Sequence, residues 1–145
     1  MSRVSTYLNF PRSTEEAFTF YKSVFGGEFT SDINRFGAVP PQEGAPAMSE
    51  EDKNLVMHVE LPILGGHVLM GTDAPESMGM TVTQGNNMHL NLEPDTRAET
   101  DRLFAGLSEG GKVHMPLQEM FWGDYFGYCT DRFGINWMFN CNSKS

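Results

Sequence analysis

Hydrophobic and polar residues alternate along the first ten positions of the chain, and the pattern then changes to a helical period. The alternating positions show the two-residue period of a half-buried strand: Val4, Thr6, Leu8 and Phe10. Over 14–25 the apolar residues recur every three or four positions, as on one face of an amphipathic helix. Ser13 and Glu16 have the spacing of a capping box, and Gly26 follows the last apolar residue. The pattern predicts a strand followed by a helix over 14–25.

The same pattern returns in the second half of the chain. Leu90-Asn-Leu92 repeats the opening strand, Thr96-Arg-Ala-Glu99 repeats the capping box, and Gly110-Gly111 ends a second helix predicted over 96–107. Strand-like runs follow each helix: 28–36, 55–61 and 67–72 in the first half, and 112–117, 125–131 and 135–140 in the second. Each half therefore has the order strand, helix and three strands, which indicates a duplicated βαβββ module.

This order predicts an α+β fold made of two tandem βαβββ modules, about 1–75 and 86–142, whose curled mixed sheets surround a cleft. The segment 37–53 is rich in Pro, Gly and Glu and has no periodicity, which predicts a long loop in the first module.

Strand alternation also predicts which residues face the cleft, because successive side chains point to opposite faces of a sheet. The apolar positions should pack under the helices: Leu8, Phe10, Leu55, Met57, Val59, Leu61, Leu90, Leu92, Ile135, Trp137 and Phe139. The opposite positions should face the cleft: Ser5, Tyr7, Asn9, His58, Glu60, Val68, Met70, Thr72, Asn87, His89, Asn91, Phe126, Tyr128, Thr130, Asn136, Met138 and Asn140. This second set is polar and aromatic with few charges, which suits a pocket for a small ligand.

Charge narrows the range of partners. The chain has 10 Lys and Arg against 19 Asp and Glu, a formal net charge of −9, and its basic residues are dispersed. Such a surface repels phosphate backbones and anionic lipid headgroups, so we expect neither nucleic acid nor membrane partners. The chain has no signal-peptide pattern and no long apolar run, and its two cysteines, Cys129 and Cys141, are expected to be buried thiols. A cytoplasmic protein is the expectation.

Several motifs, in this order, resemble the PhnB-like branch of the vicinal oxygen chelate superfamily, which includes glyoxalase I, extradiol dioxygenases and fosfomycin-resistance proteins. They cover nearly the whole chain: Glu15-Glu-Ala-Phe-Thr-Phe-Tyr21, Phe25-Gly-Gly27, Met57-His-Val-Glu-Leu61, Gly65-Gly66, Phe121-Trp-Gly-Asp124, and Tyr128-Cys-Thr-Asp-Arg-Phe-Gly134 with Trp137. The resemblance implies a single glyoxalase-like domain over 1–145, the glyoxalase/bleomycin-resistance fold, and a twofold homodimer.

The resemblance also bears on metal binding. Metal-using members take ligands from four strands, and three of those positions correspond to Ser5, Met70 and Met138, while the fourth is His89 or Asn87. Thioethers are poor ligands for hard or borderline divalent ions, and a divalent site needs about three N or O ligands. No metal and no other cofactor is therefore predicted; a divalent metal held by His58, Glu60 and His89 is the alternative.

The candidate site residues follow from these arguments. The catalytic candidates are the titratable residues predicted to face the cleft: His58, Glu60 and His89. The ligand-binding candidates supply aromatic, thioether and amide groups: Tyr7, Asn9, Met70, Asn91, Trp122, Phe126, Tyr128 and Met138. Trp122 is either a stacking lid or a hydrophobic plug at a dimer contact, and His67 and His114 are expected at the surface or at strand ends.

These candidates are compatible with three classes of function. The first is metal-independent binding of a small neutral or aromatic molecule. The second is a lyase, isomerase or dioxygenase that uses His58, Glu60 and His89. The third is a non-catalytic interaction subunit, for which 37–53 is the expected contact surface.

Overall fold

The computed structural model describes residues 2–40, 43–44 and 47–145, and the chain divides into two compact units, residues 1–82 (the first module) and 83–145 (the second module). The first module contains β1 (Thr6–Phe10), α1 (Thr14–Phe25), β2 (Asn34–Arg35), η1 (Phe36–Ala38), α2 (Glu50–Lys53), β3 (Val56–Pro62), η2 (Leu64–Gly66), β4 (Val68–Asp73) and η3 (Glu76–Met78). The second contains β5 (Leu90–Leu92), α3 (Arg97–Ser108), β6 (Lys112–Glu119), β7 (Tyr125–Thr130) and β8 (Asn136–Cys141).

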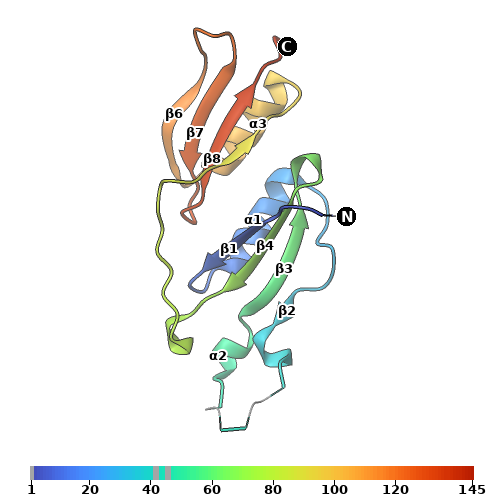
Figure 1. Ribbon diagram of the computed structural model, residues 1–145, viewed down its shortest axis with the longest axis vertical. Coiled ribbons are helices and arrows are strands. Elements are labelled where there is room, and N and C mark those ends of the chain that lie inside the picture. Colours follow the sequence, from blue (N-terminus) through green and yellow to red (C-terminus); the bar gives the residue numbers. More distant parts are fainter. Residues whose placement is uncertain (1, 41–42, 45–46) are drawn as a thin grey trace. The chain divides into compact units, whose positions relative to one another are not determined.

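Each module forms a four-stranded mixed sheet with the same connectivity (Figure 1). The strand order is β1-β4-β3-β2 in the first module and β5-β8-β7-β6 in the second. In both, the first strand pairs in parallel with the last, and the other pairs are antiparallel. The matching topology confirms the predicted α+β fold of two βαβββ modules.

One face of each sheet is covered by the helix of the same module (Figure 1). The residues buried between α1 and its sheet are Leu8, Phe10, Ala17, Phe18, Tyr21, Val59, Leu61 and Leu69. The residues buried between α3 and its sheet are Leu92, Leu103, Leu107, Cys129, Trp137 and Phe139. Most of these strand residues are those that alternation predicts to pack under the helices, but Leu55, Leu90 and Ile135, also predicted there, are only half-buried.

Several strands are shorter than predicted. The run 28–36 forms a strand only at Asn34–Arg35, and Val4 and Met88, ahead of β1 and β5, are 85% and 69% exposed. The pairing of β2 with β3 shifts register between its two residues, and Val56 rather than Met57 is buried. A register shift interrupts strict alternation, so the prediction of Met57 as a core residue was wrong.

The helix starts use different caps. Thr96 caps α3, because its side chain accepts the N–H of Glu99 at 3.1 Å, as predicted. Ser13 makes no such bond. The carboxylate of Asp73, 2% exposed, instead accepts the N–H groups of Thr14 at 3.0 Å and Val56 at 2.8 Å. The predicted capping box of α1 is therefore replaced by a carboxylate from the end of β4.

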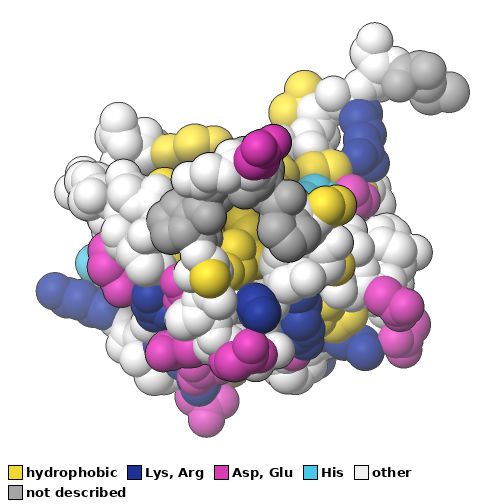
Figure 2. Space-filling view, turned by 90° about the horizontal axis from the view of Figure 1, so that it is seen from below, with side chains coloured by type: hydrophobic (Ala, Val, Ile, Leu, Met, Phe, Trp, Pro, Cys, Tyr) yellow, Lys and Arg dark blue, Asp and Glu magenta, His cyan; other side chains and the backbone are white. Residues whose placement is uncertain are grey.

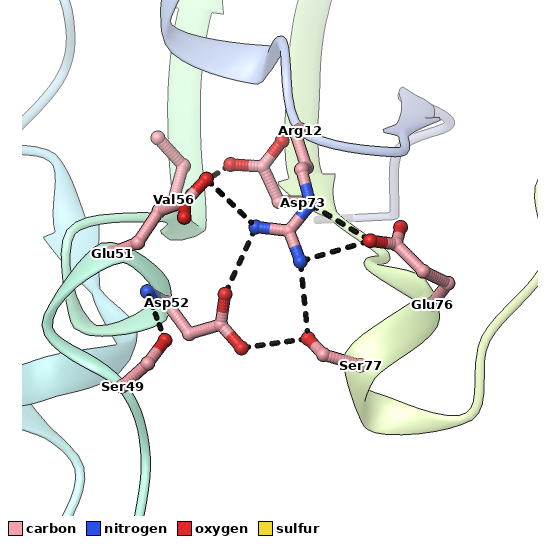
Figure 3. Close-up of polar contacts among 8 residues, drawn as sticks. All are labelled: Arg12, Ser49, Glu51, Asp52, Val56, Asp73, Glu76 and Ser77. Carbon is pink, nitrogen blue, oxygen red and sulfur yellow. Dashed lines mark hydrogen bonds and ion pairs between the residues drawn. The ribbon is translucent and has the colours of Figure 1, made fainter.

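Arg12 ties the end of the predicted loop to the rest of the first module (Figure 3). Its guanidinium donates to Asp52 at 2.9 Å and to Glu76 at 3.1 Å, and the Ser77 hydroxyl donates to Asp52 at 2.6 Å. The bonds from Ser77 and Arg12 hold the pKa of Asp52 below its ordinary value. The segment 37–53 thus ends in a short helix, α2, that the prediction missed. Residues 41–42 and 45–46 of this segment lie outside the described part of the chain.

Both cysteines are buried free thiols, as predicted. Burial raises the pKa of Cys129 to about 12, so its thiolate is scarce at neutral pH. No helix in the described residues is both long enough and apolar enough to cross a membrane. On the face shown in Figure 2, basic side chains lie interspersed with acidic ones.

Candidate functional site

The first module brings Tyr7, His58 and Glu60 together on the sheet face opposite α1. Tyr7 lies on β1 and the other two on β3, and the single residue between His58 and Glu60 puts both side chains on one face. The Tyr7 hydroxyl lies 3.1 Å from Nδ1 of His58, and Nε2 of His58 lies 2.8 Å from Oε2 of Glu60. We call this chain of hydrogen bonds the Tyr7 relay.

The proton positions in the relay follow from the chemistry of its ends. The hydrogen bond from His58 lowers the pKa of Glu60, so its carboxylate is ionised and can only accept. Nε2 of His58 must then carry a proton, and in the neutral ring Nδ1 accepts the proton of Tyr7. Partial burial raises the pKa of Tyr7, so its phenol is protonated at neutral pH. The arrangement can pass a proton from the half-exposed Tyr7 hydroxyl toward an imidazole that a carboxylate orients.

The metal positions of the superfamily do not fit a divalent ion in this module. The Ser5 hydroxyl lies 3.8 Å from the Met70 sulfur, so a hydroxyl and a thioether meet on neighbouring strands where metal-using members have stronger ligands. Among the described residues, no three His, Cys, Asp or Glu side chains are grouped so that they could hold an ion. Asn9, another ligand-binding candidate, pairs with Thr72 of β4 and is exposed on β1.

The second module presents aromatic rings on the sheet face opposite α3. Phe126 and Tyr128 of β7 are half-buried, with ring centroids 6.2 Å apart, and Trp122 lies edge-on to Phe126 at 6.3 Å. The His89 ring meets Tyr128 edge-on at 5.7 Å. We call these rings, together with His114 described below, the aromatic face.

Thioether and amide groups adjoin the aromatic face. Met138 of β8 pairs with Tyr128 on one side and with Asn91 of β5 on the other. Trp122 is 50% exposed and Phe121 beside it is 97% exposed, so the turn before β7 offers free ring surface. The ligand-binding candidates of the second module therefore share one face of one sheet.

His114 is exposed near the start of β6, as expected of a surface or strand-end residue, and its ring also belongs to this face. Its ring stacks on Tyr128 with centroids 5.7 Å apart and an interplanar angle of 26°. The register between β6 and β7 shifts between Val113 and Met115, which makes His114 the extra residue of a bulge. Pro116 could have signalled an irregular edge strand, because proline cannot donate to a sheet ladder.

The remaining histidines are divided between the modules. His67 precedes β4 and its Nε2 lies 2.8 Å from the Thr6 hydroxyl, a strand-end contact of the expected kind. His58 and Glu60 meet in the first module, whereas His89 lies in the second. A joint site of His58, Glu60 and His89 stays a prediction.

The fold agrees with a comparison against protein families. A model of the Glyoxalase/Bleomycin resistance protein/Dioxygenase superfamily matches residues 4–139, and the chain belongs to this superfamily. It is similar to Protein YjdN of Escherichia coli strain K12, at 29% identity over 142 residues, covering 94% of this chain and 93% of YjdN.

Solved structures give the same result. Protein PA1353 from Pseudomonas aeruginosa is 34% identical, with a TM-score of 0.79 and coverage of 97% of this chain and 98% of that one. The PhnB protein from Bacillus cereus is 28% identical, with a TM-score of 0.74 and coverage of 97% and 99%. The chain is therefore related to YjdN and to PhnB, and its motifs had indicated the PhnB-like branch.

Proposed function

We propose that this protein binds a small, flat, neutral or aromatic molecule on its aromatic face, without a tightly bound metal ion. The observation that carries the proposal is the exposed ring surface of Trp122, beside the half-buried rings of Phe126 and Tyr128. Aromatic rings left accessible on one sheet face offer offset or edge-to-face stacking to a flat ligand. The neighbouring Met138 thioether can adapt to the shape of such a ligand.

The residues at the metal-ligand positions of the superfamily support binding without a metal ion. Ser5, Met70 and Met138 stand at positions where metal-using members of the superfamily have ligands, and a hydroxyl and two thioethers cannot neutralise a dication. The amide of Asn91, on the edge strand next to Met138, can instead form uncharged hydrogen bonds.

The binding proposal is tested with 2-methoxynaphthalene, a flat neutral probe, by fluorescence titration in the presence of EDTA. We expect the Phe126→Ala substitution to weaken binding about tenfold, because it removes the central ring of the aromatic face. Phe29→Ala, which removes a half-buried ring of the first module, is the matched control and should leave the affinity unchanged. Equal losses in both variants, no binding by the wild type, or binding abolished by EDTA would contradict the proposal.

A second candidate function, nucleophilic catalysis assisted by a general base, is favoured by the Tyr7 relay alone. A phenol, an imidazole and a carboxylate joined by hydrogen bonds of 3.1 and 2.8 Å have the roles of a nucleophile, its base and the group that orients the base. In such a step the Tyr7 oxygen adds to an acyl carbon, its proton passes to Nδ1 of His58, and the carbonyl π electrons move to the carbonyl oxygen. When the C=O bond re-forms, the bond from the acyl carbon to the leaving group breaks, and the leaving group departs with its electron pair. Glu60 stabilises the imidazolium that forms.

The relay is tested with 4-nitrophenyl acetate. We expect the Tyr7 oxygen to take the acetyl group and release 4-nitrophenolate in a burst, which Tyr7→Phe abolishes and His58→Phe slows by at least about tenfold. Tyr125→Phe is the control, because the Tyr125 hydroxyl donates to Asp101 rather than to an imidazole. A burst that survives in Tyr7→Phe, checked by mass spectrometry of the acetylated peptide, would exclude this role for Tyr7.

A further inference from the structure

The second module contains a chain of hydrogen bonds that ends on His114. It begins at Asn136, whose Nδ2 donates to the backbone oxygens of Gly85 at 2.8 Å and Met88 at 3.1 Å. These two bonds use both amide protons of Asn136. The group of Asn136 that faces Thr130 is therefore its side-chain oxygen. The Thr130 hydroxyl donates to that oxygen at 2.8 Å.

This series of hydrogen bonds determines which nitrogen of His114 carries the proton. A threonine hydroxyl has a single proton, and Thr130 uses it toward Asn136. The Thr130 oxygen can therefore only accept from Nε2 of His114, which lies 2.8 Å away. In the neutral imidazole the proton is then on Nε2, and Nδ1 has a lone pair directed away from Thr130.

The backbone and the neighbouring ring hold the His114 side chain in place. The bulge in β6 sets His114 opposite β7, and the stacked ring of Tyr128 supports one side of the imidazole. Among the described residues, none donates a hydrogen bond to Nδ1, and His114 is exposed. Nδ1 of His114 is thus an oriented hydrogen-bond acceptor beside the aromatic rings. The hydrogen bonds that orient the imidazole involve no charged group.

We propose that His114 is the hydrogen-bond acceptor for the ligand of the aromatic face, and that this ligand is a flat aromatic molecule with its own O–H or N–H donor, such as a phenol. The inference rests on the proposed binding function and adds the polar group of the ligand. The ring of the ligand would stack on the aromatic face while its donor meets Nδ1 of His114. An aromatic anion is not expected, because a lone-pair acceptor gives it no hydrogen bond.

The test compares two probes that differ in a single donor, 2-naphthol and 2-methoxynaphthalene, by fluorescence titration at neutral pH. We expect the wild type to bind 2-naphthol about fivefold more tightly, which is the effect of one net hydrogen bond. His114→Phe keeps a ring on Tyr128 but has no acceptor, so it should bind both probes equally. Thr130→Val should reduce the preference for 2-naphthol, because valine has no oxygen to accept the proton of Nε2. Thr130→Ser keeps the hydroxyl and should retain the preference. His67→Phe, in the first module, is the matched control and should keep the preference.

The outcomes separate this inference from the proposed function. A preference for 2-naphthol that persists in His114→Phe would overturn the role of His114, while 2-methoxynaphthalene binding would still support the aromatic face. Failure of the wild type to bind either probe would overturn both proposals. Nitrogen-15 spectra of the imidazole give an independent check, because a dominant Nδ1–H tautomer of His114 would contradict the inference.

Discussion

Replacing Gly111 with alanine is expected to lower the free energy of unfolding by about 2–3 kcal/mol. A Cβ atom at Gly111 would collide with the backbone oxygen of Thr130 and would lie 2.8 Å from the carbonyl carbon of Asp131. Both atoms belong to the backbone, which cannot rotate away as a side chain can. The substitution should therefore push the start of β6 away from the end of β7.

Thermal unfolding measures this effect, at about 2–4 °C in Tm for each kcal/mol in a chain of this size. Gly85→Ala is the matched control in the same module, because a Cβ there would meet only the Asn87 side-chain oxygen at 3.6 Å. Equal Tm values for the two variants would contradict this prediction, because they would show that β6 can move away from β7 without lowering the free energy of unfolding. Because Gly111 and His114 lie close together at the start of β6, the Gly111 variant should also weaken 2-naphthol binding.

The second large effect is expected at Asp131, which is 3% exposed and lies in the turn between β7 and β8. Its Oδ2 accepts the indole N–H of Trp137 at 2.9 Å, and its Oδ1 accepts the backbone N–H groups of Phe133 at 2.8 Å and Ile135 at 3.0 Å. Asp131→Ala leaves these donors without that acceptor, and the expected loss in the free energy of unfolding is about 3–4 kcal/mol.

Urea unfolding at equilibrium would measure this loss. Asp131→Asn keeps a carbonyl oxygen for the two backbone donors and should recover part of it. Asp95→Ala, at an exposed aspartate of the same module, should change stability by no more than about 0.5 kcal/mol. Stability of the Asp131→Ala variant close to that of Asp95→Ala would mean that water replaces the carboxylate in this turn.

The features predicted well from the sequence are those with local causes. The observed α1 spans Thr14–Phe25, as the apolar spacing and the glycines after it predict, and α3 differs from its prediction by one residue at each end. The cap of α1 depends instead on Asp73, which is 59 residues away from Thr14 along the chain. A local capping signal such as Ser13 cannot reveal a competing acceptor that only the fold brings near.

The same distinction applies to the candidate site. Alternation on β3 correctly placed His58 and Glu60 on one face, because that part of the strand is regular. It missed His114, because the bulge that places this ring beside Tyr128 arises from the pairing of two strands. Sequence patterns thus predict the regular part of a sheet, while bulges and shared hydrogen bonds require the partner strand.

The position of the last strand in each module has a consequence for synthesis on the ribosome. β4 lies between β1 and β3, and β8 lies between β5 and β7, so the last strand to be made is an interior strand of its sheet. Neither sheet can close until that strand emerges, and its pairing with the first strand spans most of the module. The sheet of the first module can form once Asp73, the end of β4, has left the exit tunnel, whereas the sheet of the second module waits for Cys141. Nascent chains should therefore acquire their two halves in separate steps, the N-terminal half first.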